Sequence, residues 1–296
     1  MRLGLTTPLF TMTPDGHAPW EVDAELADVV PLVEAADRLG YEYITCSEHV
    51  VIPDDVAPVR GGRYWDPLAT FGYLSAVTTR IRFATYVLVL GYHHPLAIAK
   101  RYGTLDRISG GRLILGVGVG SLQPEFEMLG SPFDDRGARG DESLRALRTS
   151  FGRREPEFHG EFFDYSGIIV DPCGVQKTVP LWIGGRTARS LRRAVELADG
   201  WAPFGLRRDD MAAMLERARA TDAWDARQAA TDLPPFEVSL PSGKLLDPVG
   251  EPETASSVLI SLRDIGATMV NVNFRHRSPE HYVEQLEALA ELADAV

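Results

Sequence analysis

Cysteine is scarce in this chain: its 296 residues include only Cys46 and Cys173, and neither belongs to a Cys-x-x-Cys motif. A disulfide framework and a cysteine-based zinc or redox centre are therefore excluded. No stretch approaches the roughly 20 consecutive apolar residues that a membrane-spanning helix needs. The first residues also lack the apolar run and small-residue cleavage site of a secretory signal. We therefore expect a cytoplasmic protein that does not associate with membranes.

Positive charge is also in short supply. Lys and Arg total 30 against 42 Asp and Glu, so the formal net charge is −12. Clustered cations are what the phosphates of nucleic acids and anionic lipids attract. The net negative charge therefore argues against nucleic acids and membranes as partners and favours a small-molecule substrate. Apolar residues make up 45% and charged residues 24%, which is typical of a globular protein.

One unit recurs along the chain: an amphipathic helix, a Gly or polar turn, and then a short apolar strand. Eight strands are predicted, at residues 3–8, 42–46, 81–90, 112–117, 179–183, 200–204, 236–240 and 268–273. Strands that alternate with helices pair in parallel. The chain is predicted to form an α/β fold, a (β/α)8 TIM barrel, as a single domain over residues 1–296. A doubly wound open sheet is the alternative, but Thr6-Thr7-Pro8 stands where such folds carry a Gly-x-Gly-x-x-Gly turn.

Four segments are longer than plain connections: residues 10–22, 50–65, 152–178 and 220–235. The third has alternating apolar residues that suggest a hairpin. In a barrel the loops that follow strands form the mouth of the active site. The insertions after strands one, two and four are therefore expected to wall this mouth, and residues 220–235 to lie at the opposite face.

Chemically versatile side chains follow the second, third and eighth predicted strands. They are Glu48, His49, His93, His94, Arg275, His276 and Arg277. Because barrel geometry brings these strand ends to one cavity, imidazoles and an acid there could transfer protons near neutral pH. His49 is the leading candidate, since it lies directly at a strand end. In the alternative interpretation, individual histidines only hydrogen-bond loop backbone.

Two glycine patterns indicate ligand contacts. Gly116, Gly118 and Gly120 leave one face of the fourth strand without side chains, either for a flat ring or for tight packing within the barrel. Gly184-Gly185 ends the fifth strand just before a helix whose first residues follow Arg186-Thr187. Free amides at a helix N-terminus attract anions, so this second pattern predicts a phosphate site.

Several familiar catalytic motifs are missing. The chain contains no Gly-x-Ser-x-Gly elbow, no His-Glu-x-x-His and no His-x-His at the end of its first strand. No metal site is predicted. A metal-dependent barrel hydrolase built on His49, His93 or His94, and His276 is kept as an alternative.

Taken together, the motifs resemble the bacterial luciferase-like monooxygenase superfamily, and within it the probable oxidoreductases that depend on the deazaflavin coenzyme F420. The resemblance is carried by Ser47-Glu48-His49 and by residues 64–71, 104–120, 179–187 and 197–203. It extends from about residue 3 to residue 205. The last third of the chain matches only loosely, as a strand-helix-strand-helix tail.

The resemblance implies a cofactor at the mouth of the barrel, with Glu48 and His49 beside its ring as the catalytic residues. It also implies a non-prolyl cis peptide between Tyr86 and Val87. The expected cofactor-binding residues are Thr7, Tyr86, Val87, Gly118, Gly120, Ser121, Gly184, Gly185, Arg186 and Thr187. The expected substrate pocket consists of Phe10, Trp65, Tyr92, His93, Arg275 and His276.

The implied reaction is hydride transfer between reduced coenzyme F420 and a small organic substrate. An FMN-dependent monooxygenase that uses reduced flavin and oxygen is the alternative within the superfamily, and a non-catalytic flavin-binding barrel lies outside it. Sugar-phosphate dehydrogenases of the superfamily carry an acid where this chain has Ser121, which argues against glucose 6-phosphate as substrate. The resemblance further implies a homodimer.

Overall fold

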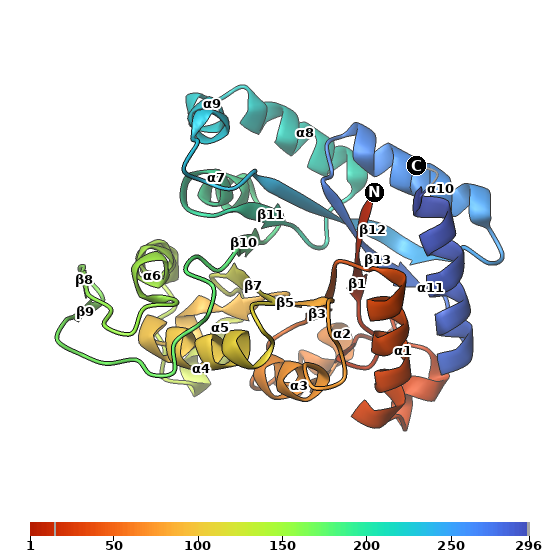
Figure 1. Ribbon diagram of the computed structural model, residues 1–296, viewed down its shortest axis with the longest axis horizontal. Helices are drawn as coiled ribbons and strands as arrows, with labels where there is room; N and C mark the ends of the chain where they lie inside the picture. Colours follow the sequence, from red (N-terminus) through yellow and green to blue (C-terminus); the bar gives the residue numbers. More distant parts are fainter. Residues whose placement is uncertain (15, 295–296) are drawn as a thin grey trace.

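Eight parallel strands form a closed ring in the computed structural model, which describes residues 1–14 and 16–294 (Figure 1). In ring order they are β1 (Arg2–Thr6), β3 (Tyr43–Cys46), β5 (Arg82–Thr85), β7 (Leu113–Gly118), β10 (Leu181–Gly184), β11 (Gly200–Ala202), β12 (Glu237–Leu246) and β13 (Met269–Phe274). The ring closes because β13 pairs with β1, and β7 pairs with β10. The predicted TIM barrel and all eight of its strands are confirmed.

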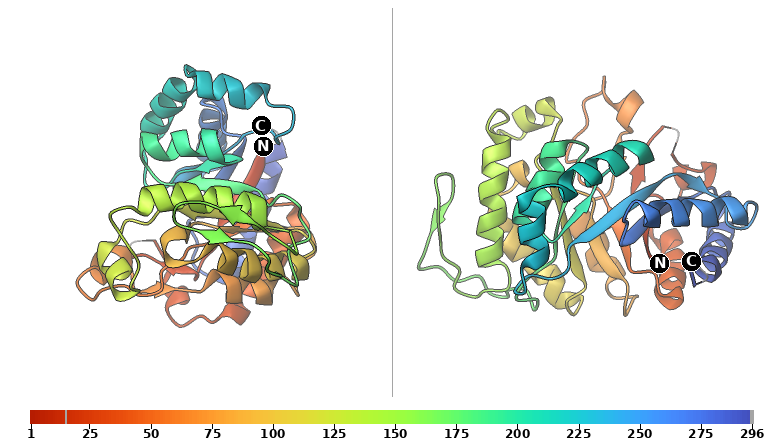
Figure 2. Two further views of the ribbon diagram at one scale, coloured as in Figure 1. Left: turned by 90° about the vertical axis from the view of Figure 1, so that its left-hand side faces the viewer. Right: turned by 90° about the horizontal axis from the view of Figure 1, so that it is seen from above.

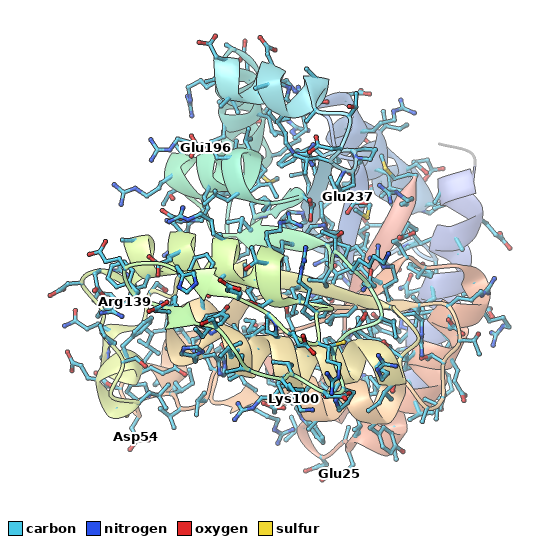
Figure 3. All side chains as sticks on the ribbon, turned by 60° about the vertical axis from the view of Figure 1, so that its left-hand side comes forward. Glu25, Asp54, Lys100, Arg139, Glu196 and Glu237 are labelled. Carbon is cyan, nitrogen blue, oxygen red and sulfur yellow. The ribbon has the colours of Figure 1, made fainter. Side chains whose placement is uncertain are left out.

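Helices surround the ring on its outer side or lie in the loops that follow its strands (Figure 2). They are α1 (Leu26–Leu39), α2 (Ala57–Arg60), α3 (Pro67–Leu74), α4 (Pro95–Ile108), α5 (Gln123–Met128), α6 (Arg136–Ser150), α7 (Ala188–Leu197), α8 (Arg208–Arg219), α9 (Asp222–Ala229), α10 (Pro252–Asp264) and α11 (Pro279–Asp294), with the 3-10 turns η1 (Pro19–Val22) and η2 (Leu90–Tyr92). Charged side chains such as Glu25, Asp54 and Glu196 project to the outside (Figure 3). The two ends of the chain meet, since the Met1 amino group donates to the carbonyl of Ala293 at 3.4 Å.

Caps explain where several helices begin. Asp66 accepts a hydrogen bond from the amide of Ala69 at the start of α3, and Pro67 follows it. His94 caps α4 in the same way, with Nδ1 accepting from the amide of Leu96 at 3.1 Å. Such caps satisfy amides that have no partner inside the helix. His94 therefore fits the structural interpretation of a histidine at a strand end.

The inside of the ring is filled by a small apolar cluster. Tyr43, Ala84, Ile114, Trp182, Ala202 and Met269 form this cluster. The Tyr43 hydroxyl lies 2.5 Å from Ser239 Oγ, and its ring meets the edge of Trp182. Gly4 makes room for this ring, because a β-carbon at that position would lie 2.0 Å from Tyr43 Cζ. The interior is therefore packed with side chains, as in other barrels of this kind.

The third predicted strand is divided into β5 and β6 (Leu88–Val89), both of which pair with β7. The bond between Tyr86 and Val87, which separates them, is a cis peptide. The cis bond expected from the family resemblance is thus present at the expected position.

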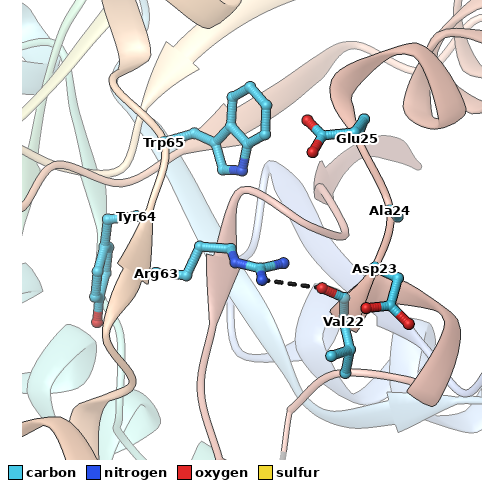
Figure 4. Close-up of a pocket in the computed structure, with 7 residues that line it drawn as sticks. All are labelled: Val22, Asp23, Ala24, Glu25, Arg63, Tyr64 and Trp65. Atoms are coloured by element: carbon cyan, nitrogen blue, oxygen red, sulfur yellow. Dashed lines mark hydrogen bonds between the residues drawn. The ribbon is translucent and has the colours of Figure 1, made fainter.

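The loops after β1 and β3 pair with each other beyond the carboxyl ends of these strands. β2 (Thr11–Met12) and β4 (Arg63–Tyr64) form a short antiparallel ladder. The Arg63 guanidinium donates to the carbonyl of Glu21 at 3.1 Å. It also donates to the carbonyl of Val22 at 2.9 Å (Figure 4). The first two insertions therefore form one connected flap at the mouth, as predicted.

The third insertion, residues 152–178, does not directly follow the fourth strand, and that part of the prediction is wrong. It follows α6, contains the predicted hairpin of β8 (Phe158–His159) and β9 (Asp164–Tyr165), and packs along the outside of α4 and α6. Two buried carboxylates explain this path. Asp106 on α4 accepts from the amides of residues 175–176, and Glu142 on α6 from those of residues 161–163. The fourth insertion, which precedes β12, contains α9.

Replacing Gly4 with alanine should destabilise the barrel, because the new methyl group would overlap the Tyr43 ring. We expect the free energy of unfolding to fall by about 1–3 kcal/mol, the usual cost of overpacking. Gly72→Ala in α3 is the matched control, since a β-carbon there has nothing within 4 Å; it should be neutral or stabilising by up to about 1 kcal/mol. Urea denaturation of both variants measures the difference, and equal stabilities would contradict the prediction.

Candidate active site

Glu48 and His93 form the first carboxylate–imidazole pair of the site. Glu48 follows β3 and is only 7% exposed. One of its oxygens lies 2.7 Å from His93 Nε2, and the other accepts from the amide of Val89 at 2.7 Å. Glu48 thereby links the end of β3 to the chain that follows β5.

His49 belongs to a second pair, whose carboxylate comes from α5. His49 Nδ1 lies 2.6 Å from Glu125 Oε2, and the His49 ring meets the edge of Tyr64. Glu125 is 0% exposed, whereas the His49 side chain is 17% exposed. The same carboxylate accepts from the Tyr92 hydroxyl at 2.6 Å and from the amides of Val50 and Val51 at 2.7 and 3.2 Å.

Glu125 remains ionised although it is buried. Burial alone would raise the pKa of this carboxyl, but the hydrogen bonds from His49, Tyr92 and Val50 outweigh burial and hold the pKa below its usual value. Burial and the neighbouring Glu125 carboxylate together raise the pKa of Tyr92, so this phenol stays protonated and donates. Glu125 is the site residue that sequence reasoning missed. Its one signal was an acid close after the glycines of the fourth strand.

The cis peptide lies beside these pairs. The carbonyl of Tyr86 accepts from Ser47 Oγ at 2.8 Å, and that of Val87 accepts from the amide of Glu48 at 3.4 Å. The Tyr86 hydroxyl donates to the carbonyl of Pro203 across the barrel. Tyr86 and Val87 therefore connect β3 with the end of β11.

Side chains of this chain lie over the glycines of β7 and over Gly120, as the tight-packing alternative expects, and contact of these residues with a ligand stays a prediction. A β-carbon on Gly118 would lie 2.8 Å from Val87 Cγ2, and one on Gly184 of β10 would lie 2.3 Å from Val87 Cγ1. One on Gly120 would lie 2.5 Å from the Phe126 ring. The space that these glycines leave is taken by side chains of this chain. A ligand at β7 would meet Val87 and glycine backbone.

The start of α7 has the features of an anion site. Gly185 has a positive φ of 115°, and Thr187 caps the helix by accepting from the amide of Ser190 at 3.2 Å. Arg186 and Thr187 are exposed, and the described residues offer Arg186 no hydrogen bond or ion pair. Thr7 is buried, and its hydroxyl has no hydrogen-bond partner among the described residues, while Ser121 is exposed.

The residues expected to form the substrate pocket do not all lie together in the structure. Tyr92 and His93 belong to the two pairs, and Trp65 lines a neighbouring cavity of about 610 Å³ (Figure 4). Val22, Asp23, Ala24, Glu25, Arg63 and Tyr64 line the same cavity. Phe10 does not line it: at 1% exposure Phe10 belongs to the apolar core, and a place for it in a substrate pocket stays a prediction.

Arg275 and His276 contact other parts of the chain. Arg275 is exposed and pairs with Asp247 at 3.7 Å and Glu251 at 3.4 Å. The side chain of His276 is buried, with Nδ1 accepting from Trp20 Nε1 at 2.9 Å and Nε2 lying 3.4 Å from Glu21. His276 thus supports the base of the flap.

Metal chemistry has no support in this arrangement. Within residues 1–14 and 16–294, no group of three or more His, Cys, Asp or Glu side chains could hold a metal ion. The histidines proposed for a hydrolase have separate partners, Glu125, Glu48 and Trp20. Burial raises the pKa of the Cys46 thiol, which donates to the carbonyl of Trp65, so this cysteine is inert.

Carboxylate-bound imidazoles and a helix N-terminus lie at one rim of this (β/α)8 barrel, the rim where enzymes of this fold class carry their active sites. Residues 6–243 match the luciferase-like monooxygenase family, and the chain belongs to this family. It is 32% identical to the uncharacterized protein Rv0940c of Mycobacterium tuberculosis over 260 residues, which cover 83% of this chain and 84% of that protein.

Two solved structures share the fold. An F420-dependent secondary alcohol dehydrogenase in complex with an F420-acetone adduct has a TM-score of 0.74 and 13% identity, covering 97% of this chain and 98% of the other. The oxygenating constituent of 3,6-diketocamphane monooxygenase of Pseudomonas putida, in complex with FMN, also has a TM-score of 0.74, with 16% identity and 98% and 97% coverage. Among the described residues, no helix combines the length and apolar character needed to cross a bilayer.

Because the side chain of His276 is buried, we expect the free energy of unfolding to depend on pH. Burial, assisted by His281, lowers the pKa of His276 to about 4 in the folded chain, against about 6.5 in an unfolded one. Between these values the unfolded chain binds more protons, so the free energy of unfolding falls as the pH drops from about 6.5 toward 4. His276→Asn keeps an acceptor for Trp20 but cannot titrate, and should flatten this fall. Denaturation of both proteins across this range measures it; parallel curves would contradict the prediction.

Proposed function

We propose that this enzyme transfers hydride between reduced coenzyme F420 and a small organic substrate, with His49 moving the accompanying proton. The observation that carries the proposal is the His49 imidazole held by a buried, ionised carboxylate at the carboxyl end of β3. The sequence resemblance to F420-dependent oxidoreductases supports the choice of cofactor, and an F420-dependent secondary alcohol dehydrogenase shares the fold.

The start of α7 fits the phosphate of such a cofactor. Amides at a helix N-terminus attract anions, and the guanidinium of Arg186 and the hydroxyl of Thr187 add donors. The Thr187 oxygen accepts from Ser190 within the cap, so its proton is available to a ligand. Gly185, at φ 115°, turns the chain so that these groups follow β10 directly.

The remaining residues supply orientation and a proton. When bound, the reduced cofactor would supply the hydride for a C=O or C=C bond, whose reduction also consumes one proton. His49 gives this proton in reduction and takes it back in oxidation. Glu48 fixes His93 and Val89 beside the cis peptide, and the flap of β2 and β4 limits the access of water.

An FMN-dependent monooxygenase is the second candidate. The FMN complex of the diketocamphane enzyme shares this fold, and the α7 site suits the phosphate of FMN as well. This candidate would use reduced flavin and oxygen, whereas the deazaflavin is not expected to activate oxygen.

Titrating the purified chain with each cofactor separates the two candidates. We expect binding of F420 with a lower Kd than that of FMN, and tighter binding of FMN would overturn the choice of cofactor. Arg186→Ala should weaken binding about 10- to 100-fold, because a charge-assisted hydrogen bond contributes about 1.5–3 kcal/mol. Arg192→Ala is the control, since Arg192 lies further along α7 and pairs with Glu196.

Replacing His49 with asparagine tests the proton transfer. We expect kcat to fall about 10²- to 10⁴-fold, the usual contribution of general acid–base catalysis. Cofactor binding should change little, because His49 is assigned to proton transfer and Arg186 to the phosphate. Steady-state kinetics and cofactor titration of the same variant measure both quantities, and an unchanged kcat would remove His49 from the mechanism.

Three further properties implied by the resemblance and the sequence complete the proposal. They are a homodimeric assembly, a cytoplasmic location and a single domain over residues 1–296. The large excess of acidic residues supports a small-molecule substrate over a polyanion.

A further inference from the structure

We propose that Glu125 is a positioning residue that keeps the ring proton of His49 on Nδ1, so that Nε2 is the atom that exchanges a proton with the substrate. The inference rests on the proposed function, since it assigns a role to His49 within it. Glu125 lies in α5, 76 residues from His49, and no motif of the sequence connects the two.

The first argument is a count of hydrogen-bonding positions. An ionised carboxylate has about four lone-pair positions and can only accept. Three donors contact Glu125 apart from His49: the amides of Val50 and Val51 on Oε1, and the Tyr92 hydroxyl on Oε2. The remaining lone-pair position lies on Oε2, which is 2.6 Å from His49 Nδ1. Because these donors keep the carboxylate ionised and an ionised carboxylate can only accept, Nδ1 is the donor and the neutral imidazole carries its proton there.

The second argument concerns the other ring nitrogen. Nε2 has no hydrogen-bond partner among the described residues. The side chain of His49 is 17% exposed, so a ligand can reach it. With the proton held at Nδ1, Nε2 keeps its lone pair. It can take a proton from a substrate hydroxyl in oxidation and return it to the substrate in reduction, with His49 alternating between imidazole and imidazolium.

The third argument is that Glu125 cannot easily move. The neighbouring Phe126 is 0% exposed, and a β-carbon on Gly91 or Gly120 would lie within 2.5 Å of its ring. Tyr92 packs against the same ring, with the centroids 4.8 Å apart. These contacts hold helix α5 in place. Glu125 therefore fixes the position of the loop after β3 and the orientation of the His49 ring.

A glutamine at position 125 should reverse the tautomer. The amides of Val50 and Val51 can only donate, so they require the oxygen of the new side chain. Its NH2 group then faces His49 and Tyr92, and an imidazole can adapt by accepting at Nδ1. Glu125→Gln should therefore move the His49 proton to Nε2 and leave no lone pair for the substrate.

Nitrogen-15 NMR of histidine-labelled protein without cofactor tests this directly, at a pH of about 8, above the usual imidazole value of about 6.5. His49→Asn assigns the signal, because it disappears from the seven histidines. We expect a protonated Nδ1 in the wild type and a protonated Nε2 in Glu125→Gln. A protonated Nε2 in the wild type would overturn the proposal, even if the variant failed to fold.

Glu142→Gln is the matched control. Glu142 is also a buried carboxylate, but it accepts from three backbone amides on the outer side of α6. Both variants should lose stability, yet only Glu125→Gln should change the tautomer and lower kcat, about 10²-fold or more, with KM little changed. If a folded Glu125→Gln protein kept the proton of His49 on Nδ1, Glu125 would only hold the loop after β3, and the proposal would be wrong. Failure to bind F420 or FMN would overturn the proposed function and leave the tautomer result intact.

Discussion

The loops at the mouth of the barrel fold around three buried carboxylates, and the site depends on how these charges are satisfied. A buried carboxylate is tolerated only when donors surround it. Glu21 accepts from the amides of residues 9 and 18, Glu48 from residue 89 and His93, and Glu125 from residues 50 and 51, His49 and Tyr92. Each carboxylate thus draws in the loop that follows a different strand. The geometry of the mouth is a consequence of this electrostatic requirement.

This construction gives the imidazoles fixed surroundings before any ligand arrives. A catalytic base is most effective when its orientation and tautomer are set in advance, because no reorganisation is then needed during the reaction. Packing also restricts the His49 ring. Phe126 holds α5 in place, and the ring centroids of Tyr64 and His49 lie 4.6 Å apart in an edge-on contact. The flap adds a cover whose base is anchored by Arg63 on the carbonyls of Glu21 and Val22. Stability and reactivity are therefore served by the same contacts.

The sequence predicted the strands well because each strand is a short apolar run between helices, a pattern that is local. It also placed Glu48, His49 and His93 at one rim, since strand ends of a barrel converge. It could not predict the partner of His49, because Glu125 lies in a helix and is brought close only by the tertiary fold. The glycines were ambiguous because their neighbours also come from the tertiary fold. Whether Val87 or a ligand fills the space beside Gly118 depends on a segment 31 residues earlier in the sequence. His276 and Arg275 follow a strand end, yet their neighbours come from η1 and from the segment before α10.

The glycines of β7 and β10 shape one arc of the rim. β3, β5, β7 and β10 are consecutive in the ring, with His49 at one end of this arc and the start of α7 at the other. Val87 lies within this arc, and its methyl groups are 2.8 and 2.3 Å from the positions that β-carbons on Gly118 and Gly184 would take. The glycines let this side chain sink between β7 and β10. At this part of the rim the chain therefore presents a half-buried valine that packs between glycine backbones of β7 and β10.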